Sequence, residues 1–442
     1  MNFSAKQIVF ISFMLFSMFF GAGNLIFPPF LGQSAGNHLW PALAGFIVSA
    51  VGLPILGVIA VAKAGSFNEL NQRAHPYFAK IFPFLIYIAI GPGLAIPRAG
   101  SLAFEMGIAP LLPDNLVASP VSLLVYSIVF FGLVAWLCMY PSKLIDLFGK
   151  LLTPILLALI AIIFVKSLID PLGKFSAPKE NYDANPVFQG VLDGYLTMDA
   201  LAALAFGIVI SNTLKAQGVL DNKKRSIYMM YAGLGAGLLL TVIYLILGYL
   251  GAASSSLGQT ENGAQILSNV MKHLFGQSGT LILGLVFTIA CFCVSIGLVT
   301  SCSQFFANAI PKINYKKWVI ILSVLSTAIA NLGLTQILKI SVPILGMIYP
   351  LAIVIIFLGI IDDFIKNHSY IYISVVSFVA IYSIIDTINK TLLASKWSGG
   401  LEFLPFYTEG LGWIIPALIG LVVGYLLGAF SGTSSDKRNN SR

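Results

Sequence analysis

The sequence predicts an all-α protein that crosses a membrane about twelve times, and three observations lead to this class. Hydrophobic residues make up 58% of the 442-residue chain, charged residues only 10%, and the mean hydropathy is +0.91. A soluble chain of ordinary composition carries about a quarter charged residues. Apolar runs of about 18 or more residues, each long enough to cross a bilayer, recur along the whole chain. Two of these runs are interrupted at corresponding places in the two halves of the sequence.

The predicted spans form one membrane domain over residues 1–430, followed by a polar tail over 431–442. The N-terminal segment has one lysine and no small-residue cleavage site, so we expect it to remain as the first helix. The third span contains Pro92 and Pro97 and is either one tilted helix or a helix with an irregular centre. The twelve spans cover about 8–31, 40–62, 79–109, 120–140, 144–168, 187–213, 226–252, 280–308, 317–334, 340–361, 370–389 and 411–430.

Lysine and arginine are unevenly distributed over the predicted loops. With the N-terminus inside, 17 of the 25 lie in inside segments, 7 lie in outside segments, and Arg98 lies within a span. Inside loops of membrane proteins are enriched in these residues. We therefore expect both termini to be cytoplasmic, and the net charge of +8 does not indicate nucleic-acid binding.

The sequence offers little for enzymatic chemistry. The four histidines fall in or near loops, the four cysteines are expected as small apolar core residues, and no carboxylates cluster within the spans. An enzyme in the membrane would need a nucleophile and base or a metal cluster. A primary pump would carry a phosphate-binding GxxxxGK[ST] motif, and an ion channel would need rings of like residues around an oligomeric pore. Nothing indicates an obligate protein partner, and the oligomeric state stays open.

The first span is interrupted within FSMFFGAGNLIFPPFLG, residues 16–32. Gly21, Gly23 and Asn24 lie near its midpoint, and Pro28 and Pro29 follow. Glycine weakens a helix, proline removes a hydrogen-bond donor, and asparagine is costly in lipid. Backbone freed from a helix at membrane depth survives only where it is buried in protein or lines a cavity. The span is therefore predicted to be a broken helix of the kind that holds substrate and ion in transporters.

The sixth span carries a second set of polar residues in GVLDGYLTMDALAALAFGIVI, residues 190–210. Asp193, Gly194, Thr197 and Asp199 lie in its first half. An ionisable residue within a span is a candidate functional residue. The alternative, a solvated residue near the outer surface, suits Asp193 better than the deeper Asp199.

Spans one and six are five apart, so the second half of the chain enters the membrane from the opposite side. This arrangement is typical of an inverted repeat with discontinuous helices at corresponding positions. The repeats would cover about 8–168 and 187–361, with two extra helices over about 370–430. The halves show no letter-by-letter similarity, so the repeat is inferred from the positions of the breaks.

The eighth span contains CVSIGLVTSCSQFF, in which Thr300 and Ser301 are adjacent hydroxyls. Such a hydroxyl often bonds back to a carbonyl of its own helix. Together with carbonyls freed by a broken helix, the pair would instead make an all-oxygen cage. Hard cations prefer oxygen ligands, so the pattern is compatible with a sodium site.

Arg98 and Glu105, in the third span, lie on one helical face about 10 Å apart along the axis. In a structural role, each side chain would pair with a group on a neighbouring helix or reach an aqueous vestibule. In a functional role, the two would form a gate or a proton-linked pair along the permeation path. Asp362 and Asp363 are expected to be solvated at the end of a span.

Three motifs together resemble the bacterial branched-chain amino acid:cation symporter family over essentially the whole chain. They are GAGNLIFPPFLG (21–32), IGPGLAIPRAGSLAFEMGIAP (90–110) and GYLTMDALAALAFG (194–207). The resemblance implies a LeuT-type fold of five plus five inverted spans with two extra helices. It also implies uptake of leucine, isoleucine and valine with Na⁺ across a bacterial plasma membrane. Coupling to protons, or a different small apolar amine substrate, remains the alternative.

The resemblance also implies site residues. Asn24 would be a sodium ligand near the substrate carboxylate, which the N–H groups of Ala22 and Gly23 would hold. Thr197 would lie near this ion and the substrate. A second sodium site would comprise the carbonyls of Ser17, Phe20 and Gly297 and the hydroxyls of Thr300 and Ser301.

The physical requirements of a zwitterionic substrate agree with this picture. Helix N-termini exposed by a break attract a carboxylate, while free carbonyls and helix C-termini suit an ammonium or a cation. Asp199 is a further candidate substrate ligand. The aliphatic side chain needs an apolar pocket, which distinguishes one methylene by only ~1–3 kcal/mol, so broad selectivity is expected. Its candidate lining residues, which could equally be core or lipid-facing, are Phe19, Phe20, Met198 and Phe206.

Overall fold

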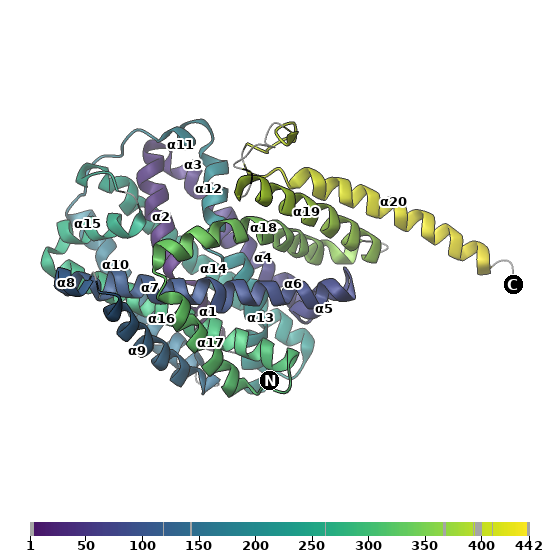
Figure 1. The fold of residues 1–442 in the computed structure, drawn as a ribbon, viewed down its shortest axis with the longest axis horizontal. Helices are drawn as coiled ribbons and strands as arrows, with labels where there is room; N and C mark the ends of the chain where they lie inside the picture. The colour runs from purple at the N-terminus through teal and green to yellow at the C-terminus, as the bar shows by residue number, and fades with distance from the viewer. Residues whose placement is uncertain are drawn as a thin grey trace.

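The computed structural model describes residues 4–439 except 118, 142–143, 261, 366–367, 392, 394–399 and 409, and this part of the chain is helical apart from turns and loops (Figure 1). The first ten α-helices are α1 (Ala5–Phe19), α2 (Ala22–Ala35), α3 (Leu39–Ile47), α4 (Leu53–Ala64), α5 (Phe67–Gln72), α6 (Pro76–Ile88), α7 (Ala95–Gly107), α8 (Asp114–Val117), α9 (Pro120–Cys138) and α10 (Thr153–Ile169). The others are α11 (Glu180–Ala184), α12 (Pro186–Tyr195), α13 (Asp199–Ala216), α14 (Asn222–Ala253), α15 (Gly263–Phe275), α16 (Gln277–Ala309), α17 (Tyr315–Ala330), α18 (Leu334–Ile361), α19 (His368–Thr391) and α20 (Ile414–Asn439).

Shorter helical turns connect these elements. The π-helical segments are Val48–Gly52, Ala89–Gly93 and Ile145–Leu152. The 3₁₀ segments are Gly36–His38, Ala109–Leu111, Ser254–Leu257 and Asp362–Phe364.

The predicted class, an all-helical protein with many membrane spans, is confirmed. Among the described residues, nine helical runs are long and apolar enough to cross a membrane, and Ala5–Phe19 and Ile414–Phe430 are shorter apolar helices. One of the nine, Ala22–Ala64, contains Gly36 at φ +49°, which ends α2 and turns the chain toward α3. Each of the twelve predicted ranges coincides with one helix or with two consecutive helices.

The predicted breaks in spans one and six are both present. Phe20 and Gly21 have extended backbones between α1 and α2. Residues 196–198 separate α12 from α13, and Met198 has a left-handed backbone at φ +69°. A non-glycine residue in this conformation costs ~1–3 kcal/mol and persists where its surroundings hold it. Met198 is buried, so packing at the break supplies that support.

The third span has an irregular centre, one of the two expected possibilities. A π-helical turn over Ala89–Gly93 separates α6 from α7, and Gly91 has non-helical backbone angles (φ −86°, ψ −129°). Pro92 lies in the same turn and lacks the N–H that a continuous helix would use. A side chain at Gly91 would come within 2.9 Å of the Cys302 sulfur, so the kink also lets α16 approach closely.

The helices of spans two and six approach each other backbone to backbone. A Cβ atom added to Gly190 of α12 would lie 2.0 Å from the carbonyl oxygen of Ala42 in α3. In return, a Cβ atom on Gly45 of α3 would lie 2.0 Å from the carbonyl oxygen of Val187. Small residues at helix interfaces in membranes allow this close packing. The first half of the broken sixth span is therefore held against α3 (Figure 1).

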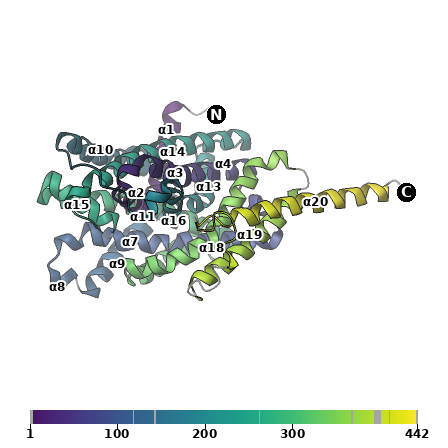
Figure 2. The ribbon, with the colours of Figure 1, turned by 90° about the horizontal axis from the view of Figure 1, so that it is seen from above.

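The last two helices pack against each other, and α20 extends beyond the rest of the bundle in both ribbon views (Figures 1 and 2). The helix continues to Asn439. Residues 440–442 of the predicted polar tail lie outside the described residues, as do Lys143, Lys366 and Lys396 of the orientation argument. The division into two repeats and a tail stays a prediction.

The expectation that Asp362 is solvated was wrong. This residue is 8% exposed, its carboxylate forms an ion pair with Arg73, and the Tyr372 hydroxyl donates to it at 3.0 Å. A buried carboxylate needs such partners. Asp363 has an exposed side chain, as expected, and pairs with Lys63 at 2.8 Å.

Candidate functional site

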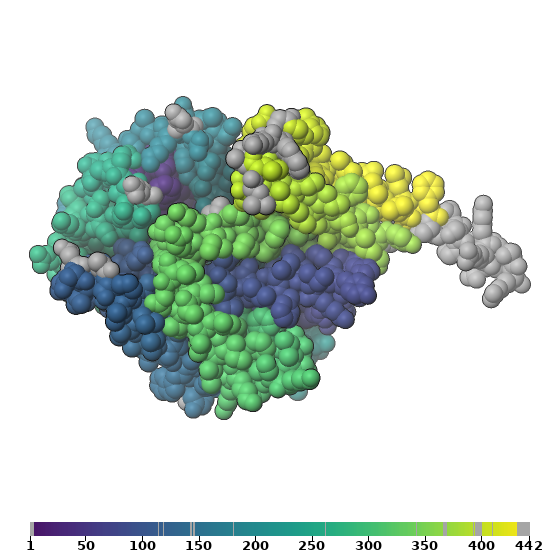
Figure 3. Space-filling model, viewed as in Figure 1, coloured from purple at the N-terminus to yellow at the C-terminus, as the bar shows by residue number. Residues whose placement is uncertain are grey.

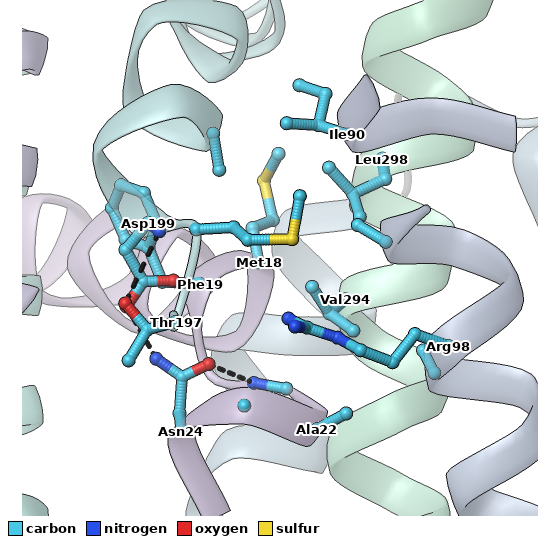
Figure 4. A pocket seen from close by; sticks show the side chains of 16 residues that line it. Met18, Phe19, Ala22, Asn24, Ile90, Arg98, Thr197, Asp199, Val294 and Leu298 are labelled. Carbon is cyan, nitrogen blue, oxygen red and sulfur yellow. Dashed lines mark hydrogen bonds between the residues drawn. The ribbon is translucent and has the colours of Figure 1, made fainter. Parts of the chain in front are cut away.

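The two helix breaks border one buried cavity of about 30 Å³ (Figure 4). α1, α2 and the residues between them form one side, and the start of α13 forms another. α7 and α16 complete the wall. Seven sequence-predicted site residues line this cavity: Phe19, Ala22, Gly23, Asn24, Thr197, Met198 and Asp199.

Two other predicted pocket residues lie behind the wall. Phe206 packs against Phe19, with ring centroids 5.3 Å apart, and Phe19 itself lines the cavity. Phe20 stacks on Phe16 at 5.1 Å and is fully buried. Their rings support the cavity from outside instead of facing it.

Asn24 and Asp199 join the two breaks through a buried hydrogen bond. The Asn24 amide donates to an Asp199 carboxylate oxygen at 2.5 Å and also contacts the Tyr244 hydroxyl. Tyr244 donates to the same carboxylate oxygen at 3.1 Å. All three residues are at most 2% exposed. The cluster satisfies one oxygen of Asp199 and fixes the relative position of α2, α13 and α14.

Asn24 also caps the break in the first span. Its side-chain oxygen accepts a hydrogen bond from the Gly21 N–H at 3.1 Å. Gly21 needs to be small, because a Cβ atom there would lie 2.6 Å from a Val294 methyl carbon. The first N–H groups of α2 follow at Ala22 and Gly23, and the first N–H groups of a helix have no acceptor within it. This helix start is therefore suited to an anionic group.

Thr197 and Asp199 are held by the backbone of the second break. The Thr197 hydroxyl donates to the Gly194 carbonyl at 2.8 Å and accepts from the Asp199 N–H at 3.4 Å. Asp193 lies outside the cavity, where it accepts hydrogen bonds from Tyr182 and Gln189. The deeper of the two acidic residues is thus the one at the cavity.

Arg98 points its guanidinium toward the middle of the cavity from α7, opposite Asn24 and Asp199 (Figure 4). Its side chain is buried, with 4% exposed, and one guanidinium nitrogen donates to the Leu196 carbonyl at 3.2 Å. The Nε atom has no hydrogen-bond partner. Arg98 and Asp199 thus bring a guanidinium group and a carboxyl group to the same space, yet no ion pair within 4.0 Å joins them. Glu105, on the same helix, is exposed and does not line the cavity.

The candidate sodium-binding hydroxyls of α16 are buried and contact other helices. Thr300 donates to the Cys138 sulfur at 3.4 Å, and Ser301 donates to the Ala205 carbonyl at 2.8 Å. Ser17 of α1 pairs with Thr153 at 2.5 Å. Gly297 meets α1 directly, because a Cβ atom on it would lie 2.9 Å from Met18. The structure therefore brings Gly297 next to α1, while the hydroxyls bond elsewhere.

Sequence reasoning missed several residues of the site. Tyr244 was not singled out, although a tyrosine inside the apolar stretch LTVIYLILGYL is a polar group in need of a partner. The apolar wall also includes side chains that the sequence does not distinguish from core residues. These are Met18, Ile90, Ala95, Ala99, Ala202, Val294 and Leu298.

A family profile described as "Branched-chain amino acid transport protein" matches residues 4–431. The chain belongs to this family. It is 45% identical to the branched-chain amino acid permease BrnQ of Bacillus subtilis (strain 168) over 97% of this chain and 98% of that protein. It is 37% identical to the permease BrnQ of Escherichia coli (strain K12), over 96% and 95% of the two chains. As a member of a transport family, the protein is a permease and not an enzyme, as expected.

Two solved transporters share the fold of this family member. The nucleobase-cation-symport-1 transporter Mhp1, in a closed conformation with bromovinylhydantoin bound, has a TM-score of 0.63 at 13% identity, covering 94% of this chain and 91% of Mhp1. MhsT in complex with L-phenylalanine has a TM-score of 0.60 at 16% identity, covering 96% and 98%. The expected LeuT-type fold is thereby confirmed.

Proposed function

We propose that this protein is a secondary active symporter that takes up leucine, isoleucine and valine together with Na⁺ by alternating access. It would do so across the plasma membrane of a bacterium, with both termini in the cytoplasm. The observation that carries the proposal is that both helix breaks, Arg98 and Asp199 border one buried cavity. The names of the related permeases support the choice of substrate.

The opposite charges of the cavity suit the two ends of an amino acid. The N–H groups of Ala22 and Gly23, together with the Arg98 guanidinium, would bind the carboxylate. Asp199 and Thr197 would receive the ammonium group. In a low-dielectric site, the carboxylate and the ammonium group of an amino acid each need a polar or charged partner.

The apolar wall would receive the aliphatic side chain. Two of its members, Met18 and Met198, are flexible and adapt to different shapes. The cavity has room for about one water molecule, so these side chains must move before leucine binds. That requirement agrees with a transport cycle in which the site opens and closes.

Sodium would bind as a co-transported substrate at oxygen atoms near the breaks. Asn24 and Thr197 would serve a first ion beside the amino acid. A second ion would use the carbonyls of Ser17, Phe20 and Gly297, with the hydroxyls of Thr300 and Ser301 turned away from their present partners. The donor set consists of oxygen atoms, which hard cations prefer. Gly297 already contacts α1, and in this proposal the Thr300 and Ser301 hydroxyls rotate toward the same ion.

Coupling would follow if the bound cation completes the substrate site. Moving one charge through 100 mV is worth ~2.3 kcal/mol. At ~1.4 kcal/mol per tenfold, one cation would sustain about 40-fold accumulation of the amino acid. The bundle that contains the two broken helices would rock against the remaining helices.

Proton coupling is the second candidate, and one observation favours it. Asp199 is a buried carboxylate at the site, and a carboxylate in such surroundings is able to bind and release a proton as its partners change. Asn24 and Tyr244 are the partners that would move with the breaks.

Uptake of labelled leucine into proteoliposomes tests the proposal. Vesicles would carry an inward sodium gradient or an inward proton gradient, with unlabelled isoleucine and valine as competitors. Sodium-driven uptake that both competitors block is the expected result. Uptake driven only by protons would support proton coupling through Asp199 in place of sodium coupling. If folded protein took up no leucine under either gradient, the assignment of leucine as a substrate would be wrong.

A further inference from the structure

One backbone carbonyl of α13 is bonded to two other helices by side-chain hydroxyls. The Ala205 carbonyl accepts hydrogen bonds from the Tyr87 hydroxyl of α6 at 3.1 Å and from the Ser301 hydroxyl of α16 at 2.8 Å. We propose that these three residues form a floor that holds the cavity closed on the side carrying the N-terminus, with Tyr87 as its positioning residue. The inference rests on the proposed function, in which α13 moves against α6 and α16.

The floor lies about one helical turn from the cavity on each of its three helices. Each floor residue is three positions away from a residue that lines the cavity, and residues three apart share one face of a helix. The lining residues next to Tyr87, Ala205 and Ser301 are Ile90, Ala202 and Leu298, respectively. The two hydroxyl bonds therefore join three walls of the cavity directly beyond its lining.

The contacts of α14, which follows α13 after a short loop, show on which side of the cavity the floor lies. A Cβ atom on Gly235 would lie 2.3 Å from the Ser12 hydroxyl of α1. Farther along α14, a Cβ atom on Gly251 would lie 2.0 Å from the Pro29 carbonyl oxygen of α2. The start of α14 and the end of α13 thus lie toward the N-terminal part of α1. The floor, between the cavity and the end of α13, is on this side, which the proposed function assigns to the cytoplasm.

The floor is buried, and packing fixes the ring of Tyr87. All three floor residues are at most 2% exposed, although α6 and α17 reach the surface on the face shown in Figure 3. The Tyr87 ring stacks on Phe305 of α16 with the centroids 4.0 Å apart, and the Cys302 thiol donates to the Tyr87 carbonyl at 3.5 Å. Removing the hydroxyl alone would therefore leave the ring and its packing in place.

The chemistry of the floor allows it to open and close. A carbonyl inside an α-helix already accepts from the N–H four residues later, so the two hydroxyls are able to leave Ala205 without stranding it. Hydrogen bonds between helices in a membrane are of modest strength, which suits a contact that breaks in every cycle. Ser301 is also a proposed sodium ligand, whereas Tyr87 has no other role, so Tyr87 gives the clearer test.

A cysteine at Ala202 would measure access to the cavity from each side of the membrane. Ala202 lines the cavity one turn from the floor. A membrane-impermeant thiosulfonate reagent would be added to right-side-out and to inside-out vesicles, and an epitope tag would show which side carries the N-terminus. The same protein without the added cysteine gives the background from the four native cysteines, which are buried.

Tyr87→Phe is expected to speed modification of the Ala202→Cys protein about 3–20-fold from the side of the N-terminus, as expected for loss of one hydrogen bond between helices. Modification from the other side should not become faster. Ser301→Ala should act in the same direction. Tyr315→Phe is the matched control, because the Tyr315 hydroxyl donates to the Cys138 carbonyl at 2.7 Å and joins α17 to α9 without α13. It should leave both rates unchanged.

Two results would overturn the floor. One is an equal or lower rate in Tyr87→Phe from the side of the N-terminus. The other is faster modification from both sides, which would indicate general loosening in place of opening toward one side. Leucine uptake by the same preparations keeps the two proposals apart. Uptake without the one-sided increase rejects the floor alone, whereas a one-sided increase without uptake retains the floor and rejects leucine as the substrate.

Discussion

The side-chain amide of Asn24, just after the break in the first span, donates a hydrogen bond to the carboxylate of Asp199, the first helical residue after the break in the sixth. The two residues are 175 positions apart in the sequence. Their contact makes the two broken helices one polar unit at the cavity. We therefore expect a ligand that displaces either side chain to break this link between α2 and α13.

Replacing Asp199 by Asn is expected to lower leucine uptake about 10–100-fold, since hydrogen bonds to charged groups contribute about 1.5–3 kcal/mol. The change keeps the size of the side chain and removes its charge. Tyr244→Phe keeps the carboxylate and removes one of the two donors to it, so its loss should be smaller than that of Asp199→Asn. Initial rates in proteoliposomes, at equal amounts of folded protein, provide the measurement. A larger loss in Tyr244→Phe than in Asp199→Asn would contradict the role of the charge.

Arg98→Gln is expected to raise the KM for leucine about 10–100-fold, because a charge-assisted contact to the carboxylate is lost. Arg98→Lys keeps the positive charge but loses the planar guanidinium with its several N–H donors. Its KM for leucine should therefore lie between those of Arg98→Gln and the unchanged protein. Glu105→Gln is the matched control, since Glu105 is exposed on the same helix and outside the cavity. Equal KM values for Arg98→Gln and Glu105→Gln would show that Arg98 does not bind substrate.

The sequence predicted the positions of both breaks because their signals are local. Glycine, asparagine and aspartate inside apolar runs are unfavourable in a continuous lipid-facing helix, so Gly21, Asn24 and Asp199 could be identified without a structure. Seven residues around these breaks line the cavity as expected.

The rest of the site depends on long-range packing, which a single sequence does not encode visibly. Val294 and Leu298 resemble any apolar helix residues, yet they line the cavity because Gly21 allows α16 to approach. Tyr244 and Asp199 meet only once α14 packs beside α13. Asp362 was misread for the same reason, because its partner Arg73 lies far away in the chain.

Thr300→Ala and Ser301→Ala are each expected to raise the sodium concentration for half-maximal uptake about tenfold, by removing one oxygen ligand of the second ion. Uptake at saturating sodium should change far less. Ser303→Ala is the matched control: Ser303 is a buried hydroxyl of the same helix that lacks a hydrogen-bond partner. An unaltered sodium dependence in both Thr300→Ala and Ser301→Ala would remove these residues from the ion site.

Gly190→Ala is expected to destabilise the protein, because the added carbon would lie 2.0 Å from the Ala42 carbonyl oxygen and force α12 away from α3. Overpacking of this kind costs about 1–3 kcal/mol. Gly132→Ala in α9 is the matched control, since nothing lies within 4 Å of its added carbon. Thermal unfolding of the purified variants, followed by tryptophan fluorescence, should show a lower Tm for Gly190→Ala and no loss for Gly132→Ala. Equal Tm values would mean that α3 and α12 move apart without loss of stability, and would contradict the tight packing inferred for them.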